Sequence, residues 1–204
     1  QRQMCIRDRL EAVHDGQLDV AAVAAPVNDN SLVTVPVFRE EFLLATGADD
    51  ELARGEGPID PHDVPTEGLI LMSEGHCLRD QVIEVCSSSR PLPPDTLTAG
   101  SLETLRELVS VGAGRTLMPR SAISTPLHAD PRIVVREFTR PRPHRDIVVC
   151  SRPATMNRPA VHALITILRQ LPSDVVEPLG VAGASSCSHG TVSYTHLRAH
   201  ETLR

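Results

Sequence analysis

Apolar residues in this chain come in short runs, each closed within a few positions by glycine, proline or a charged residue, and this pattern constrains the fold most. Residues 18–25 (LDVAAVAA) suit a buried parallel strand. Helices are predicted at residues 77–86 and 102–111, with Ser101 as the cap of the second, and a last helix begins at Pro159. Further strands are expected at residues 32–38, 42–46, 68–72, 115–118, 133–138 and 147–150. This alternation predicts an α/β fold with a mostly parallel sheet.

Two other segments complete the pattern. Residues 10–13 are expected to end a helix that stops at Gly16. Residues 48–67 are rich in Gly, Pro, Asp and Glu, and they are expected to form an exposed connection.

The composition narrows the possible functions. Hydrophobic residues make up 41% of the 204 residues and charged residues 23%, which is the balance of a globular domain. The net charge of −6 disfavours nucleic-acid binding by these residues themselves. No apolar run approaches the roughly 20 residues of a membrane-spanning helix, so an integral membrane protein is excluded. With one Tyr, three Phe and no Trp, the core must be aliphatic.

The two ends of the chain differ from the interior. Residues 1–9 (QRQMCIRDR) and residues 192–204 resemble translated transposon-end adaptors of the kind used to prepare sequencing libraries. We therefore expect neither segment to be native, and we expect the native protein to begin upstream of Leu10. Residues 176–191 are expected to form a flexible tail.

Two of the five cysteines have a spacing of chemical interest. Cys5 lies in the first end segment, Cys150 ends an apolar strand, and Cys187 lies in the polar tail. The remaining two, Cys77 and Cys86, match no zinc-binding spacing, so we expect no metal and no cofactor.

Cys77 and Cys86 are joined by a segment without Gly or Pro that is predicted to be helical. Nine helical steps rise about 13.5 Å and leave the two side chains on opposite faces. A disulfide needs Cα atoms roughly 4.4–6.8 Å apart, so the two cysteines can join only if the helix unwinds. Such a bond would be a conformational switch. The alternative is two unrelated cysteines, one in the core and one near a loop.

Cys77 has the neighbours of a reactive thiol. It follows a strand and lies near a helix N-terminus, beside His76 and Arg79. The helix dipole and the positive neighbours favour the thiolate, which is the nucleophile toward peroxide. Oxidation gives a sulfenic acid that a second thiol can condense with.

Several motifs resemble the OxyR branch of the LysR-type transcriptional regulators, the branch that senses peroxide. They are residues 74–81 (EGHCLRDQ) followed by Cys86, residues 100–106 (GSLETLR) and residues 112–119 (GAGRTLMP). Residues 16–19 (GQLD) and 38–45 (FREEFLLA) fit the same family in the same order. The resemblance covers residues 10–171, and the first motif with its second cysteine is specific to that branch.

The resemblance implies a two-lobed fold of the type II periplasmic-binding-protein architecture, truncated at its N-terminus. Residues 10–38 and 147–175 would form regulatory subdomain I, and residues 39–146 would form subdomain II with the redox cysteines. The family's DNA-binding helix-turn-helix, and the first strand and helix of the regulatory domain, would precede these residues.

The resemblance also implies roles for single residues. Cys77 would be the peroxidatic and Cys86 the resolving cysteine, with His76, Arg79 and Arg145 around the thiolate. Asp19 and Arg152 match positions linked to contact with RNA polymerase. Simpler structural roles remain open: an Asp that opens a strand is often a turn residue, and an Arg before a strand is often a solvated ion-pair partner.

The implied partners are hydrogen peroxide, a second or further copies in a homodimer or tetramer, and promoter DNA through the missing helix-turn-helix. RNA polymerase and a thiol reductant such as glutaredoxin complete the set. The protein would be cytoplasmic, without membrane contact, and not an enzyme. One alternative is a LysR-type effector domain that binds a small organic ligand without redox chemistry. The other is a thiol peroxidase.

Overall fold

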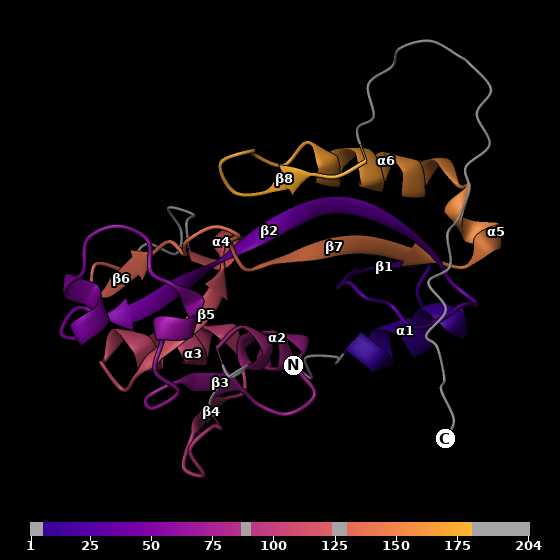
Figure 1. The fold of residues 1–204 in the computed structure, drawn as a ribbon. Coiled ribbons are helices and arrows are strands. Elements are labelled where there is room, and N and C mark those ends of the chain that lie inside the picture. The colour runs from indigo at the N-terminus through magenta and orange to yellow at the C-terminus, as the bar shows by residue number, and fades with distance from the viewer. Residues whose placement is uncertain (1–5, 87–90, 124–129, 181–204) are drawn as a thin grey trace, which may run out of the picture.

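The computed structural model describes residues 6–86, 91–123 and 130–180 (Figure 1). Two halves are joined by two long antiparallel strands, β2 (Val33–Gly47) and β7 (His144–Ser151), which run from one half into the other. Beyond β7, the end of β2 pairs with β5 (Arg115–Pro119) and β6 (Ile133–Arg136). The two strands thus carry the chain across the middle of the molecule.

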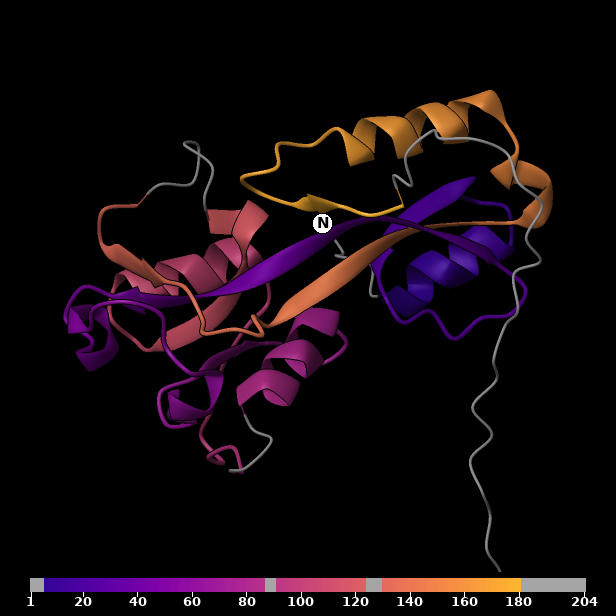
Figure 2. The same ribbon diagram turned by 45° about the horizontal axis from the view of Figure 1, so that its top comes forward.

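The first half is built on β7 and β1 (Val20–Ala24). Helix α1 (Ile6–His14) covers one face of these strands, and α6 (Pro159–Arg169) covers the other (Figures 1 and 2). Val13 of α1 lies in the cluster on the first face, while Val161 and Ile165 of α6 lie in the cluster on the second. The short α5 (Pro153–Met156) links β7 to α6.

The prediction of a mostly parallel sheet is wrong. Among the described residues, every strand pair of the large sheet is antiparallel, including β1 with β7, and the small sheet of β3 (Ile70–Met72) and β4 (Leu97–Ala99) is parallel. The apolar run in β1 arises because helices cover both of its faces. Such cover produces a continuous apolar sequence whatever the direction of the neighbouring strand.

The separate strands expected at residues 32–38 and 42–46 are one strand, β2, with a register shift between Pro36 and Phe38. Arg39, Glu40 and Glu41 lie between the two apolar runs. In the structure each of these side chains pairs with an opposite charge on a neighbouring element, so the strand continues through them.

The second half packs α2 (Cys77–Cys86) and α3 (Leu102–Ser110) against β3, with α4 (Arg120–Ile123) following β5. Its core is aliphatic apart from two buried aromatic residues, Phe42 and Phe138, as the composition predicts. Ser101 caps α3 by accepting a hydrogen bond from the Thr104 N–H at 3.1 Å, which confirms the predicted helix start.

The connection at residues 48–67 is less exposed than expected. It contains two short 3₁₀ turns, η1 (Glu51–Arg54) and η2 (Pro61–Asp63), and it buries Ile59, Val64 and Thr66. Apolar residues among its Gly, Pro and acidic neighbours anchor it to the core of the second half.

The expected flexible tail at residues 176–191 is ordered where it is described. Val176 is buried, and β8 (Glu177–Pro178) pairs with β2; residues 181–191 lie outside the described residues. Of the two end segments, residues 6–9 form the start of α1, while residues 1–5 and 192–204 also lie outside the description. Within the described ranges, no helix combines the length and apolar character that crossing a bilayer requires.

Candidate functional site

Cys77 is the first residue of α2, directly after the turn that leaves β3. That turn contains Gly75, whose φ of 86° lies in the left-handed region that favours glycine. The buried face of α2, made by Leu78, Val82 and Cys86, packs into the core of the second half. The predicted helix over residues 77–86 is confirmed.

Cys77 itself is partly buried and lies where the two halves meet. It packs against the cluster of the first half that contains Val37 and Ile147. It also lines a cleft of about 780 Å³ between the halves, together with the residues that follow β1, the exposed side of α2 and the start of β7. A second hollow of about 50 Å³, lined by Val23, His76 and Cys77 among others, opens beside it. Cys77 is thus accessible to a small reagent.

Of the two charged or titratable neighbours that the sequence places beside Cys77, only His76 lies next to it in the structure. His76 shares the small hollow with Cys77. Arg79 lines neither hollow, because its guanidinium turns back to β3 and donates to the Met72 carbonyl at 3.3 Å. Helical spacing over residues 77–86 predicts a solvated Arg79, and this prediction is wrong: the side chain is partly buried against the end of β3.

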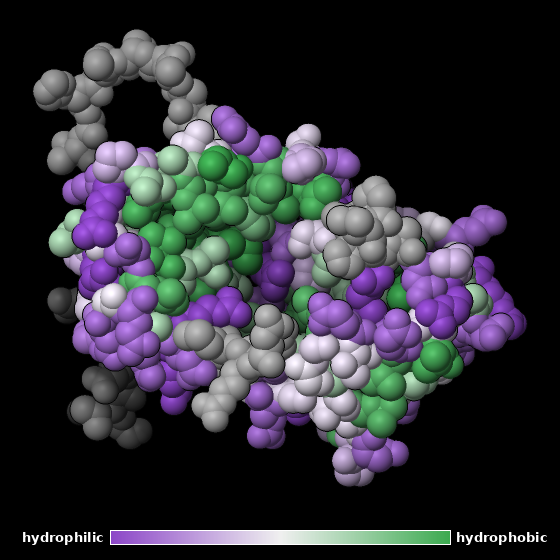
Figure 3. All heavy atoms as spheres, turned by 180° about the vertical axis from the view of Figure 1, so that it is seen from behind, coloured by the Kyte–Doolittle hydropathy of each residue, from purple (hydrophilic) through white to green (hydrophobic). Residues whose placement is uncertain are grey.

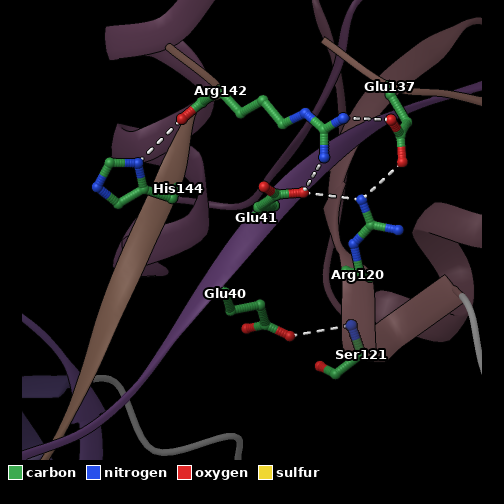
Figure 4. A network of polar contacts seen from close by, with 7 residues as sticks. All are labelled: Glu40, Glu41, Arg120, Ser121, Glu137, Arg142 and His144. Atoms are coloured by element: carbon green, nitrogen blue, oxygen red, sulfur yellow. Dashed lines mark hydrogen bonds and ion pairs between the residues drawn. The ribbon is translucent and has the colours of Figure 1, made fainter. Parts of the chain in front are cut away.

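Arg145, at the start of β7, lines the same large cleft as Cys77. Its Nε and Nη2 atoms lie 2.8 and 2.7 Å from Oε2 of Glu40, and its guanidinium carbon lies 5.9 Å from the centre of the Phe42 ring. Glu40 is only 1% exposed, and its Oε1 accepts the Ser121 N–H at 3.0 Å (Figure 4). No local pattern in the sequence points to Glu40, because its partners are distant in the chain.

Cys86 lies at the other end of α2, where it is 5% exposed. Burial raises the pKa of its thiol to about 12, so it is a neutral thiol at pH 7. Helical geometry separates the two ends of α2 by about 13.5 Å, and Cys77 and Cys86 are free thiols here. Cys150 is a fully buried core residue of β7, and burial raises the pKa of its thiol to about 11.

Next to the cleft, a network of carboxylates and guanidinium groups joins β2 to the segments around α4 and β7 (Figure 4). Glu41 accepts from Arg120 at 2.8 Å and from Arg142 at 3.0 Å, and Glu137 bonds to the same two arginines. Burial acts most strongly on Glu41 and raises its pKa, but the two arginines outweigh it and hold the pKa below its ordinary value.

The fold brings Asp19 and Arg152 together on the first half. Their side chains form an ion pair at 3.3 Å, and Asp19 also pairs with Arg158 at 3.2 Å. Arg152 donates as well to the carbonyls of Val13, at the end of α1, and of Leu18, the latter at 2.8 Å. The positive charge of Arg152 therefore stabilises the C-terminal end of α1 and links it to the end of β7. Among the described residues, no group of three or more His, Cys, Asp or Glu side chains could hold a metal ion.

The chain thus forms two halves with separate cores, which face each other across a cleft and are joined by two crossing strands. Residues 5–172 match the family model described as the LysR substrate binding domain, and the chain belongs to this family. Within it, the chain is similar to OxyR proteins, which confirms the resemblance seen in the sequence. It is 32% identical over 167 residues to a "probable hydrogen peroxide-inducible genes activator" of Streptomyces viridosporus, covering 81% of this chain and 53% of that protein.

Other relatives agree. Identity to the "DNA-binding transcriptional dual regulator OxyR" of Escherichia coli is 32%, covering 78% of this chain and 52% of that protein. The reduced OxyR regulatory domain of Pseudomonas aeruginosa has a similar structure, with a TM-score of 0.73, 30% identity, and coverage of 81% of this chain and 78% of that one. A reduced form of OxyR from Neisseria meningitidis shares the fold, with a TM-score of 0.75, 24% identity, and coverage of 86% and 81%. The chain spans about half the length of the curated relatives it matches.

Proposed function

We propose that this chain is the redox-sensing regulatory domain of a LysR-type transcription factor that responds to hydrogen peroxide through a reversible Cys77–Cys86 disulfide. The observation that carries the proposal is the placement of the two thiols on one helix. Cys77 begins α2 in the cleft, and Cys86 is buried at the far end. The names of the relatives point to the same signal.

The chemistry requires two steps. The Cys77 thiolate attacks one oxygen of hydrogen peroxide, the O–O bond breaks, and the hydroxide that leaves is protonated to water; Cys77 becomes a sulfenic acid. Cys86 then attacks the sulfenic sulfur, the S–S bond forms, and a second water leaves with the Cys86 proton. Two electrons pass from the thiols to peroxide. A dithiol reductant such as glutaredoxin would return them and restore both thiols.

The second step couples the chemistry to conformation. Because the intact helix α2 separates its two ends by about 13.5 Å, Cys86 can reach Cys77 only after the helix unwinds. Unwinding withdraws Leu78 and Val82 from the core of the second half. The resulting rearrangement would change how the domain pairs with another copy, and this would change how the whole regulator binds promoter DNA. Since each cycle needs an external reductant and a refolding step, the domain would act as a switch and not as an enzyme.

The remaining assignments belong to the same proposal. His76, Arg79 and Arg145 would form the surroundings of the thiolate, and Asp19 with Arg152 would meet RNA polymerase. Residues 10–38 and 147–175 would act as subdomain I, and residues 39–146 as subdomain II; the separate core clusters of the two halves support this division. The parent regulator would be cytoplasmic and would bind DNA through a helix-turn-helix outside this chain.

A homodimer or tetramer is supported by apolar surface on the half that contains α6 (Figure 3). Among the large exposed apolar side chains of that half are Val33 on β2 and Ile167 on α6, the latter 61% exposed. Apolar surface of this kind marks contacts between proteins.

The test is peptide mapping after oxidation. The reduced protein is treated with about one equivalent of peroxide at neutral pH, and linked peptides are identified by mass spectrometry without reductant. A rapid Cys77–Cys86 link with Cys150 still free is expected. Slow oxidation of all cysteines to the same extent would contradict the proposal. Many turnovers of peroxide with a supplied reductant would instead indicate a thiol peroxidase.

One observation favours a second candidate. The cleft of about 780 Å³ has the size of a small-molecule site, so the domain could answer an organic effector without redox chemistry. A Cys77→Ser variant of the whole regulator that still responds to peroxide in cells would favour this reading.

A further inference from the structure

Glu40 is an acidic side chain buried at the centre of the molecule, and nothing in the reaction described above uses it. It lies on β2 and is 1% exposed. A carboxylate that is removed from water is stable only when it is paired and hydrogen-bonded. Glu40 meets this condition through Arg145 on β7 and the Ser121 N–H at the start of α4.

The two carboxylate oxygens of Glu40 accept hydrogen bonds from different partners. Oε1 accepts the Ser121 N–H at 3.0 Å, which fixes the carboxylate to the backbone of the second half (Figure 4). Oε2 accepts from both Nε and Nη2 of Arg145, at 2.8 and 2.7 Å. Two donors on one oxygen hold the guanidinium in a single orientation, and the Phe42 ring lies 5.9 Å from its centre. Phe42, Arg145 and Cys77 all line the same cleft.

We propose that Glu40 is a positioning residue for the redox site: it holds the Arg145 guanidinium in place on the wall of the cleft that Cys77 lines. The inference rests on the proposed function, which assigns Arg145 to the thiolate. Without Glu40, the cation would be free to turn toward other carboxylates of the cleft. The remaining titratable or charged side chains that line the two hollows are Arg9, His76, Asp80, Glu84, Arg142, His144 and Asp146.

The experiment measures the rate at which iodoacetamide alkylates Cys77 as a function of pH, with the site identified by peptide mapping. Glu40→Gln keeps the size of the side chain and its acceptor for Ser121, but removes the charge and places an amide against the donors of Arg145. We expect the rate at neutral pH to fall about tenfold, because a guanidinium that has lost its carboxylate partner no longer keeps one orientation on the wall of the cleft. An unchanged or faster rate would overturn the proposal.

A double-mutant comparison separates positioning from a structural role. Glu40→Gln and Arg145→Gln should slow Cys77 to a similar extent, and the double variant should be no slower than either one. Effects that multiply would show that Glu40 does not act through Arg145. Asp50→Asn is the matched control, because Asp50 pairs with Arg115 at 3.1 Å in the second half, is well buried and lines neither hollow; it should react like the unaltered protein.

If Glu40→Gln fails to fold, Glu40→Asp replaces it. This variant keeps the charge but draws the carboxylate back from Arg145 by one methylene, so Cys77 should still react more slowly; a wild-type rate would overturn the proposal. Alkylation needs neither peroxide nor a disulfide. Should peroxide produce no Cys77–Cys86 bond in the unaltered protein, the proposed function fails, while the alkylation profiles still decide the role of Glu40.

Discussion

The packing of α2 determines how often Cys86 becomes accessible, and Val82→Ala tests this directly. Val82 lies in the middle of α2 and is 2% exposed in the core of the second half. Removing two of its carbons costs about 2 kcal/mol of burial and packing when the helix is closed. Alanine favours the helix over valine by up to about 0.5 kcal/mol, which offsets part of this loss. The net change of about 1.5 kcal/mol should raise the population of the unwound helix roughly tenfold.

The assay is alkylation of Cys86 in reduced protein that carries Cys77→Ser, read by peptide mapping under native conditions. Because the thiol is buried in the closed helix, its rate reports the population of the open one. Val82→Ala should therefore accelerate Cys86 about tenfold. In protein that retains Cys77, it should also accelerate disulfide formation after peroxide.

Val109→Ala is the matched control. Val109 lies on α3, is fully buried and belongs to the same core cluster, so its truncation lowers the stability of this half without touching α2 packing locally. If both variants accelerate Cys86 equally, the thiol becomes accessible by unfolding of the whole half. That result would refute the argument that α2 unwinds by itself.

Three further predictions concern pH and stability. Burial raises the pKa of the Cys86 thiol from 9.0 to about 12, so the unfolded chain loses this proton at lower pH than the folded chain does. The free energy of unfolding should therefore fall as pH rises from 9 toward 12, by about 2 kcal/mol at about pH 10.5. Urea titrations of Cys86→Ala should lack this contribution. Arg152→Ala should lower the free energy of unfolding, measured in urea, by about 1–3 kcal/mol and should expose the amides of α1 to hydrogen exchange. Asp19→Asn, which breaks an exposed ion pair, should lower it by less than about 1 kcal/mol. Equal losses in the two variants would contradict the proposed anchoring of α1 by Arg152. Ser101→Ala should lower the free energy of unfolding by about 1 kcal/mol and the melting temperature by roughly 2–4 °C. Ser101→Asn can also cap the helix and should retain most of the stability. A similar loss in both variants would exclude the cap as the cause.

Local sequence features predicted the elements well because their causes are local. The segment from Cys77 to Cys86 has an apolar stripe and contains no Gly or Pro, which predicts a helix. Ser101 predicts the start of α3 because serine is a favourable N-cap. The motifs around Cys77 also indicated the family that the comparisons confirm. Where prediction failed, the cause was tertiary. Charges at residues 39–41 separate two apolar runs and so predict two strands, but partners on distant elements pair with these charges and β2 continues through them.

The spacing and the chemistry of the two thiols follow from the sequence alone: they lie at opposite ends of one helix and cannot meet while that helix is intact. What surrounds the two thiols depends on the fold. It placed Cys77 in the cleft between the halves, turned Arg79 away to the Met72 carbonyl, and paired Arg145 with Glu40 across 105 residues of chain. Periodicity reports contacts within a few residues, whereas these contacts depend on how β2 and β7 cross, and no local pattern records that crossing.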